Sequence, residues 1–528
     1  MKKLWALGVA GLVLASCHSS IRQVEPSEAF RGALDEVMLR QPNANKVKPD
    51  DLGRRTEPVI LRLSFDDCIE LSMAHNRTVL FEQLNREVAA ADVIGAKSNL
   101  DFTVGANIGY TREEQDIQSR FFGDSRDKEI TAVTNYGINA SLPFATGTTV
   151  DISGGFRRSD SNNPFQAFEF FPTATLTVTQ RLLNGFGFVP NLGNSWIAEN
   201  NLTIADWQVE VARNEQALAV AMAYWNLVEA EGELDVRYRS EDLAEDALEL
   251  ARSRLEAEIG TRLDVLAQEA NLAAQQVQII RAEALVETRV DELLYAIHPD
   301  LIHGYALFEN YSIVIEPTTR ADTARTSSDD PVLIEEVKAA LRRRPEIRQA
   351  AMRIKNSGIS IDMAEYGLLP SLDLSGNFGV DGFGQEFDDS LTSFNKFENL
   401  NYGFELRFGV PIQNSAARAQ LARSEIAKRN AILTARDVET GVILEVAQAV
   451  REIKSSRRSV DAAEEARRLQ AETYEAEQER QRAGLATAYE VKQALNDLTQ
   501  AELDLVNARI VLERARLQLQ KSTGELGR

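Results

Sequence analysis

The residues of this chain that could do chemistry are few and widely separated. Its four histidines are too scattered to form a metal site with one free cysteine; they are His18, His75, His298 and His303. The chain also lacks hydrolytic signatures and phosphate-cradling glycine loops. The sequence therefore predicts no enzyme, no metal site and no bound cofactor.

Two acidic residues occupy matching positions in the chain. Asp264 and Glu490 each directly precede a valine that begins a seven-residue apolar repeat, which predicts a helix packed along one partner. The first repeat is Val265, Leu272, Ile279, Val286 and Leu293, and the second is Val491, Leu498, Leu505, Leu512 and Leu519. Alanines accompany the second repeat and favour close helix packing: Ala494, Ala501, Ala508 and Ala515. The two repeats lie 226 residues apart and predict a duplicated architecture.

The N-terminus has the features of an export signal. Lys2 and Lys3 precede an apolar run that is too short to span a bilayer. The run ends in Leu14-Ala15-Ser16-Cys17, which resembles the lipobox of bacterial lipoproteins. The resemblance implies cleavage before Cys17, lipid attachment there, and outer-membrane sorting because His18 follows. An ordinary signal peptide with a chance cysteine is the alternative.

Composition narrows the fold and the partners. A net charge of −22 argues against nucleic acid, because phosphate binding needs a clustered basic surface. Aromatic residues make up only 7% of a chain rich in Ala, Glu, Arg, Gln and Leu, which favours long helices. Cys68 lies in an apolar helical pattern and is predicted to be a small core residue.

Several segments of about ten residues alternate between apolar and polar side chains, a pattern typical of membrane-spanning β-strands. They contain Phe102 to Tyr110, Tyr136 to Leu142, Val150 with Ile152, Leu176 with Val178, Leu372 to Val380, and Phe404 to Val410. Glu405 and Arg407 lie inside the last segment, so we place them toward a water-filled lumen. A half-buried strand of a soluble sheet would show the same alternation. The aromatic segment 165–171 is read as a surface loop or an interfacial anchor.

Helical periodicity fills most of the remaining chain and divides it into two halves. Helices are predicted over residues 63–97, 194–259, 265–297, 332–369 (broken near Pro345) and 416–483, and over the second heptad repeat. From the first strand to the tip glycine, the first half has about 48 residues more than the second, enough for an additional β-hairpin.

At this point the chain resembles the TolC-like outer-membrane efflux proteins. The residues that carry the resemblance are Leu368-Leu369-Pro370-Ser371-Leu372, Gly409-Val410-Pro411-Ile412, the turn from Gln180 to Gly187, and the segment from Gly484 to Glu490. Arg181 stands where proline is common in the family. The order of these motifs, the duplication and the lipobox reinforce one another.

The resemblance implies a mainly α fold with membrane β: a trimeric outer-membrane β-barrel continued by a long periplasmic α-helical barrel, built from an internal structural repeat. Each protomer of the family usually contributes four strands. The implied function is the exit duct of a tripartite efflux or type I secretion system. Its partners would be a periplasmic adaptor, an inner-membrane transporter and outer-membrane lipids. The alternative is a coiled-coil structural lipoprotein that tethers the outer membrane.

The resemblance also assigns roles at the two helical tips. Gly260, Thr261, Gly484 and Leu485 would dock the adaptor. Asp264 and Glu490, with Arg262 and Tyr489 as partners, would ring the periplasmic aperture in three copies and favour cations. The first tip is two residues shorter from glycine to acid, and a solvated helical face is the alternative.

We therefore expect a signal peptide at residues 1–16 and an acylated extended segment at residues 17–62. Two repeats would follow at residues 63–298 and 331–528, separated by a mixed linker at residues 299–330. The second repeat should hold two membrane strands. Drug, metal and protein cargo cannot be separated on this basis, although lipid on Cys17 favours drug or metal by family habit.

Overall fold

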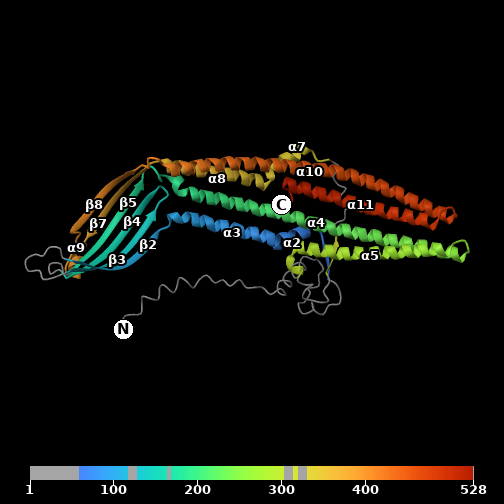
Figure 1. Ribbon diagram of the computed structural model, residues 1–528, viewed down its shortest axis with the longest axis horizontal. Helices are drawn as coiled ribbons and strands as arrows, with labels where there is room; N and C mark the ends of the chain where they lie inside the picture. Colours follow the sequence, from blue (N-terminus) through green and yellow to red (C-terminus); the bar gives the residue numbers. More distant parts are fainter. Residues whose placement is uncertain (1–58, 117–127, 163–167, 303–312, 319–329, 527–528) are drawn as a thin grey trace, which may run out of the picture. The chain divides into compact units, whose positions relative to one another are not determined.

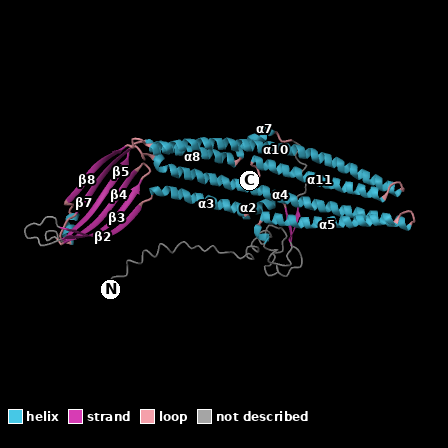
Figure 2. Ribbon diagram, viewed as in Figure 1, coloured by secondary structure: helices cyan, strands magenta, loops and turns pink. Residues whose placement is uncertain are grey.

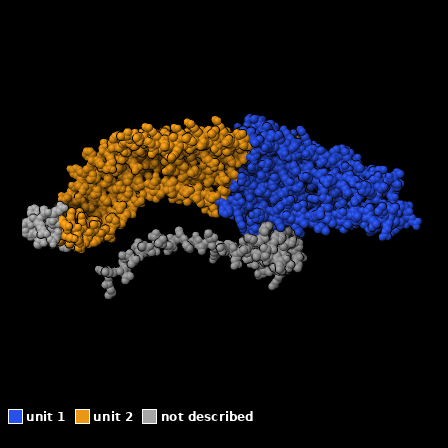
Figure 3. Space-filling view, in the orientation of Figure 1, with its two compact units in different colours: residues 1–81, 212–343, 443–528 blue, residues 82–211, 344–442 orange. Residues whose placement is uncertain are grey.

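A computed structural model describes residues 59–116, 128–162, 168–302, 313–318 and 330–526. The chain divides into two units, coloured separately in Figure 3. Unit 1 comprises residues 1–81, 212–343 and 443–528, and unit 2 comprises residues 82–211 and 344–442. Two long helices, α4 (Phe188–Glu256) and α10 (Ser415–Arg482), contribute residues to both units. Lipid attachment at Cys17, the signal peptide and His303 lie outside the described residues.

Unit 1 is built on two long helical hairpins and a small sheet. The hairpins pair α4 with α5 (Arg262–Ile297) and α10 with α11 (Ala488–Thr523) (Figure 1). β1 (Val59–Leu63) pairs in parallel with β6 (Ile313–Pro317). Three short helices complete the unit: α2 (Phe65–His75), η3 (Pro299–Ile302) and α7 (Leu333–Arg343).

The core of unit 1 gathers around α2, α4 and α5. Phe65 contacts Tyr224 edge to face, with ring centroids 5.7 Å apart, and Tyr224 is fully buried. Leu293 and Leu294 of α5 are buried in the same cluster. Cys68 is also fully buried here, which confirms its predicted place in the core. Burial raises the pKa of its thiol to about 12.

The heptad positions of both repeats are buried or half-buried, in agreement with the prediction. In α5, Val265, Ile279 and Leu293 are buried. In α11, Val491 and Leu498 are buried, together with three of the predicted alanines: Ala494, Ala501 and Ala515. The small alanine side chains let neighbouring helices approach closely here.

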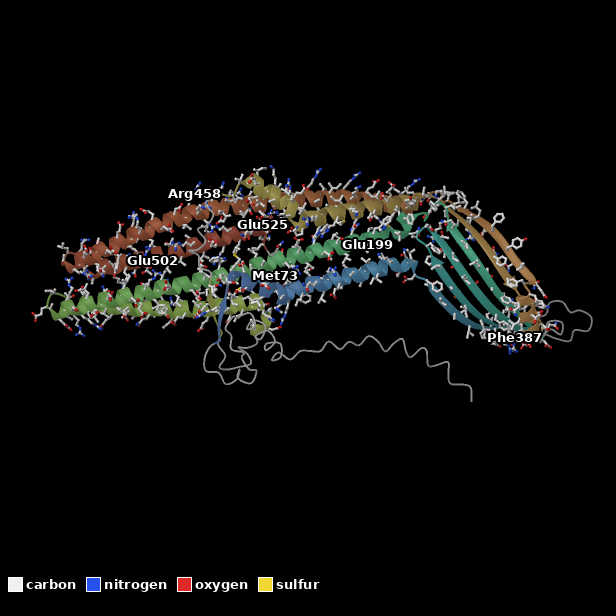
Figure 4. All side chains as sticks on the ribbon, turned by 180° about the vertical axis from the view of Figure 1, so that it is seen from behind. Met73, Glu199, Phe387, Arg458, Glu502 and Glu525 are labelled. Atoms are coloured by element: carbon white, nitrogen blue, oxygen red, sulfur yellow. The ribbon has the colours of Figure 1, made fainter. Side chains whose placement is uncertain are left out.

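Unit 2 joins four helical segments to one sheet (Figure 2). The helices are α3 (Arg77–Lys97), α8 (Pro345–Leu368) and the parts of α4 and α10 that belong to this unit. The strands are β2 (Thr103–Asp116), β3 (Lys128–Pro143), β4 (Thr148–Ser161), β5 (Phe168–Arg181), β7 (Ser371–Asp381) and β8 (Asn399–Gly409). The short helices η2 (Ser98–Leu100) and α9 (Phe387–Asn395) complete it, and Phe387 is labelled at the far end of the strands in Figure 4.

The six strands form one antiparallel sheet in the order β2-β3-β4-β5-β7-β8. The first half therefore supplies four strands and the second half two. The register places most of the apolar residues of the six strands on one face: Ile108 lies opposite Tyr136, and Leu176 lies opposite Phe378. Threonine, serine, asparagine and glycine dominate the other face. Pairs of asparagine with glycine recur on it, such as Asn107 opposite Gly137 and Asn377 opposite Gly403.

The strands differ from prediction mainly at their beginnings and ends. Phe170 and Phe171 lie within β5, so that part of segment 165–171 is strand and not loop; residues 163–167 lie outside the described part. β1 was missed, because residues 18–60 carry no sustained period. α4 begins six residues before the predicted start. Among the residues described, no helix is both long enough and apolar enough to cross a membrane.

Candidate functional site

The two acidic residues begin their helices as parts of capping boxes. Thr261 is the N-cap of α5: its hydroxyl and its backbone N–H both donate to Oδ2 of Asp264, at 2.6 and 3.1 Å. Thr487 does the same for α11, with its N–H 2.6 Å and its hydroxyl 2.9 Å from Oε2 of Glu490. In return, each threonine oxygen accepts from the backbone N–H of the acid. These bonds satisfy N–H groups that a helix start leaves without partners.

The same bonds affect the acidity of Glu490. The backbone N–H of Thr487, then its hydroxyl, and Arg480 nearby lower the pKa of this carboxyl below its ordinary value. The carboxylate thus stays charged in acid where a free glutamate begins to protonate. Within one chain, the cation near Glu490 is Arg480 of α10. The partnership of the two acids with Arg262 and Tyr489 in a ring of three copies stays a prediction. Arg262 and Tyr489 are exposed at the starts of α5 and α11.

The preceding helices end in identical turns. In the first tip, the N–H of Glu258 donates to the carbonyl of Leu255, and that of Ile259 donates to Arg254. In the second tip, Gly484 donates to Gln481 and Leu485 donates to Arg480. This is the Schellman arrangement, which requires one residue with positive φ. That residue is Glu258 in the first tip (φ 61°) and Gly484 in the second (φ 77°).

The turn geometry corrects the sequence alignment of the tips. Gly260 does not correspond to Gly484; Glu258 does, exactly as far before Asp264 as Gly484 is before Glu490. The apparent two-residue shortening of the first tip therefore disappears. Gly260 has another reason to be glycine, because a Cβ there would lie only 3.0 Å from the backbone nitrogen of Leu255.

Exposed apolar side chains crown both tips at matching positions. Ile259 and Leu263 in the first tip are 70% and 75% exposed, and Leu485 and Tyr489 in the second tip are each 71% exposed. Large apolar side chains exposed this fully at a turn suit contact with a partner. The adaptor-docking and aperture roles of the tip residues stay predictions.

The two hairpins of unit 1 contact each other through polar groups near the tips. Arg254 of α4 donates to the carbonyl of Gln481 at the end of α10. Gln268 of α5, almost fully buried, donates to the carbonyl of Ala488 in α11 at 3.2 Å. Farther along, Glu502, labelled in Figure 4, lies 3.6 Å from Arg239 and 3.4 Å from Arg467. Between the hairpins, these contacts join α4 to both α10 and α11, and α5 to α11.

In unit 2, the predicted charged pair lies on the polar face of the sheet. Glu405 and Arg407 form an ion pair at 3.0 Å, and both side chains are largely exposed. Their neighbours across the sheet are Ser375 and Asp373. The placement agrees with a water-facing surface, and the lumen itself stays a prediction. Among the described residues, no cluster of three or more His, Cys, Asp or Glu side chains could hold a metal ion.

Residues 337–525 match the family model for the outer membrane efflux protein. This part of the chain is an outer membrane efflux protein domain. For residues 337–525, the family predicted from the motifs is confirmed. No curated protein matches the chain in sequence.

Solved structures share the fold of this efflux protein domain and of most of the remaining chain. A membrane protein from Pseudomonas aeruginosa is 15% identical, with a TM-score of 0.64, covering 87% of this chain and 92% of its own. The CmeC outer membrane channel from Campylobacter jejuni is 15% identical, with a TM-score of 0.60 and coverage of 92% and 93%. The MtrE outer membrane channel of Neisseria gonorrhoeae, in its open state, is 17% identical, with a TM-score of 0.61 and coverage of 88% and 89%. At these identities the likeness establishes the fold.

Proposed function

We propose that this protein is the outer-membrane exit duct of a tripartite efflux or type I secretion system. The observation that carries the proposal is the six-stranded antiparallel sheet with one apolar and one polar face, in a chain with an efflux protein domain. A lipid-facing surface next to a water-facing one is what a membrane β-barrel needs. The duct is passive and needs no cofactor.

The sheet itself argues that copies of the chain assemble. β2 and β8 are its edge strands, and hydrocarbon offers no hydrogen bonds to the backbone groups of an edge. Adjoining copies would satisfy those edges by closing a shared barrel. We infer a homotrimer, as in the family, with the long helices forming the periplasmic conduit and Cys17 carrying a covalent lipid.

The tips are the parts that would meet the partners. Two hairpin ends with the same capping box, the same turn and the same exposed apolar crown form a repeated surface for a periplasmic adaptor. The adaptor would connect the duct to an inner-membrane transporter, which supplies the energy.

Reconstitution tests the proposed function directly. We expect a trimer that resists detergent until heated, stays with membranes in carbonate, and conducts ions in planar bilayers. A protein that is a monomer in detergent, that carbonate releases from membranes and that carries no current would contradict the proposed duct. That result would favour a periplasmic coiled-coil tether.

A further inference from the structure

The two additional strands, β3 and β4, are full members of the sheet. Fourteen residue pairs join β2 to β3, and thirteen join β4 to β5. The β3–β4 hairpin is therefore inserted into the middle of the sheet and not folded against its side. Its apolar residues continue the apolar face: Tyr136 lies opposite Phe156, and Ile152 lies opposite Leu176.

The turn of this hairpin is fixed to the chain segment that leads from β5 into α4. The carbonyl of Gly147 accepts from the N–H of Arg181 at 3.2 Å, and the carbonyl of Thr146 accepts from the N–H of Gly187 at 3.0 Å. Gly147 has a φ of 86°, and a Cβ there would collide with the carbonyl of Gly185. The turn thus fits one specific site beside the helices.

The strands of unit 2 outnumber its long helices. Four strand ends continue into helices, because α3 leads to β2, β5 to α4, α8 to β7, and β8 to α10. Only β3 and β4 are joined by a tight turn on the helix side, so the hairpin widens the sheet without adding a helix. In a trimer, six strands per copy stand above four helices per copy.

Simple geometry shows what this mismatch does. Strands about 4.8 Å apart and tilted by about 40° give a backbone radius of about 18 Å for eighteen strands and about 12 Å for twelve. Twelve helices spaced about 9 Å apart form a ring whose axis radius is about 17 Å. About 5 Å is then subtracted from each radius, to allow for inward side chains in the barrel or for half a helix in the conduit. The lumen radius of the eighteen-stranded barrel then matches that of the helical conduit, whereas the lumen radius of the twelve-stranded barrel is smaller.

We propose that the β3–β4 hairpin sets the bore of the membrane barrel by widening it in the trimer to eighteen strands, so that hydrophilic cargo about 20 Å across fits through this part of the duct. The inference rests on the proposed function. The strand count permits closure, because six antiparallel strands leave β8 of one copy antiparallel to β2 of the next. The second copy completes the wall that the first leaves open.

The hairpin adds a hydrated wall and no barrier. Its contribution to the polar face is mainly small and uncharged: Asn135, Gly137, Asn139, Ser153 and Gly155. The carboxylate of Asp151 accepts a hydrogen bond from Ser141, and Arg157 lies over the ring of Phe171 at 5.4 Å. These contacts hold the two charged groups close to the sheet.

The experiment measures which polyethylene glycols enter the channel from the β-barrel side, read as a drop in conductance. The full-length protein is compared with a variant that lacks residues 128–161, in which residues 117–127 and 162–167 connect β2 directly to β5. We expect the limiting polymer radius to fall about twofold in the variant, following the lumen radii above. Deletion of α9, residues 387–395, is the matched control and should leave the limit unchanged.

Cysteine labelling decides the matter if the shortened chain does not assemble. In the full chain, Ser153→Cys on the polar face should react with a charged thiol reagent, whereas Ile152→Cys should react only with a lipid-soluble one. An unchanged polymer limit in a conducting deletion variant would overturn the inference, as would equal labelling of both positions. Absence of any current from the full-length trimer would instead overturn the proposed function.

Discussion

At the scale of single residues, two roles of the acids at the tips can be tested separately: helix capping and the proposed lining of the aperture. Asp264 and Glu490 each complete a capping box, so their presence has a structural explanation that does not involve a pore. Alanine at either position would remove the cap and the charge together. Amide variants largely separate the two, because an amide oxygen at this position of a capping box can still accept the hydrogen bond from the backbone of the N-cap residue.

Replacing the two acids with amides should reduce cation selectivity without loosening the helices. We expect Asp264→Asn with Glu490→Gln to shift the reversal potential of reconstituted trimers toward zero while the melting temperature stays within a few degrees. The paired alanine variant should show the same shift and a lower melting temperature. If the amide variant keeps its full selectivity, these residues do not line the aperture.

The lowered pKa of Glu490 gives the acid dependence a direction. A carboxyl whose pKa falls on folding stabilises the folded state above its unfolded pKa, and that contribution is lost as the pH falls through the folded pKa. Because Glu490 also keeps its charge to a pH below 4.5, the ordinary value, we expect its contribution to cation selectivity to persist to that pH and then to decline. Reversal potentials measured from pH 6 to pH 3 check this, and a midpoint above 4.5 would count against the capping contacts.

Glu258 carries a strain that its counterpart Gly484 avoids. A side chain in the left-handed region costs about 1 kcal/mol, so Glu258→Gly should raise the stability of the first tip by about that amount. Gly484→Ala should lower the stability of the second tip to a similar extent. Thermal unfolding of the trimer measures both, and equal melting temperatures would mean that the tips unfold before the rest.

At the scale of elements, sequence periodicity was a good guide to the long helices. The heptad repeats placed α5 and α11 within three residues of their observed starts, because burial along one stripe imposes the period. Alternation located all six strands of the large sheet for the same reason. β1 was missed because five residues carry too little pattern. The tip alignment failed because it matched Gly260 with Gly484, whereas the left-handed residue of the first tip is Glu258.

The contact between the hairpins rests on a small apolar cluster beside the second tip. Leu495 is 1% exposed and packs with Tyr474 and Ala244, so Leu495→Ala should destabilise the protein by about 2–5 kcal/mol. Leu485→Ala removes the same atoms from a side chain that is 71% exposed, and should cost little. Denaturant unfolding of the two variants should separate them clearly; similar losses would contradict the packing.

At the scale of the whole molecule, the sequence predicts the features that one chain forms by itself better than those that several chains form together. The order of strands and helices could be predicted from one chain, and so could the family. The number of strands in the sheet needed the structure, since the extra 48 residues alone did not say whether they joined it. The lumen belongs to several chains, and so does the aperture, which is why both stay proposals.

Mixed assemblies give a prediction at this scale. If barrel width is the sum of what each copy contributes, co-expression of the full chain with the variant lacking residues 128–161 should give trimers of intermediate width. Single channels would then fall into discrete classes of polymer size limit between the two parent values. Two classes alone would mean that sheets of unequal width do not join.

The β3–β4 hairpin returns the chain to the end of the sheet at which it departs, where Asp116 pairs with Lys128 and Asp160 with Phe168, and its turn lies beside the junction of β5 and α4. An insertion of this kind can be gained or lost without reversing any later segment, so pore diameter becomes a trait that evolution can change one hairpin at a time. The helices and tips, which we propose recognise the partners, need not change with it. A protein engineer could use the same site to graft hairpins and obtain nanopores of graded bore from a single scaffold.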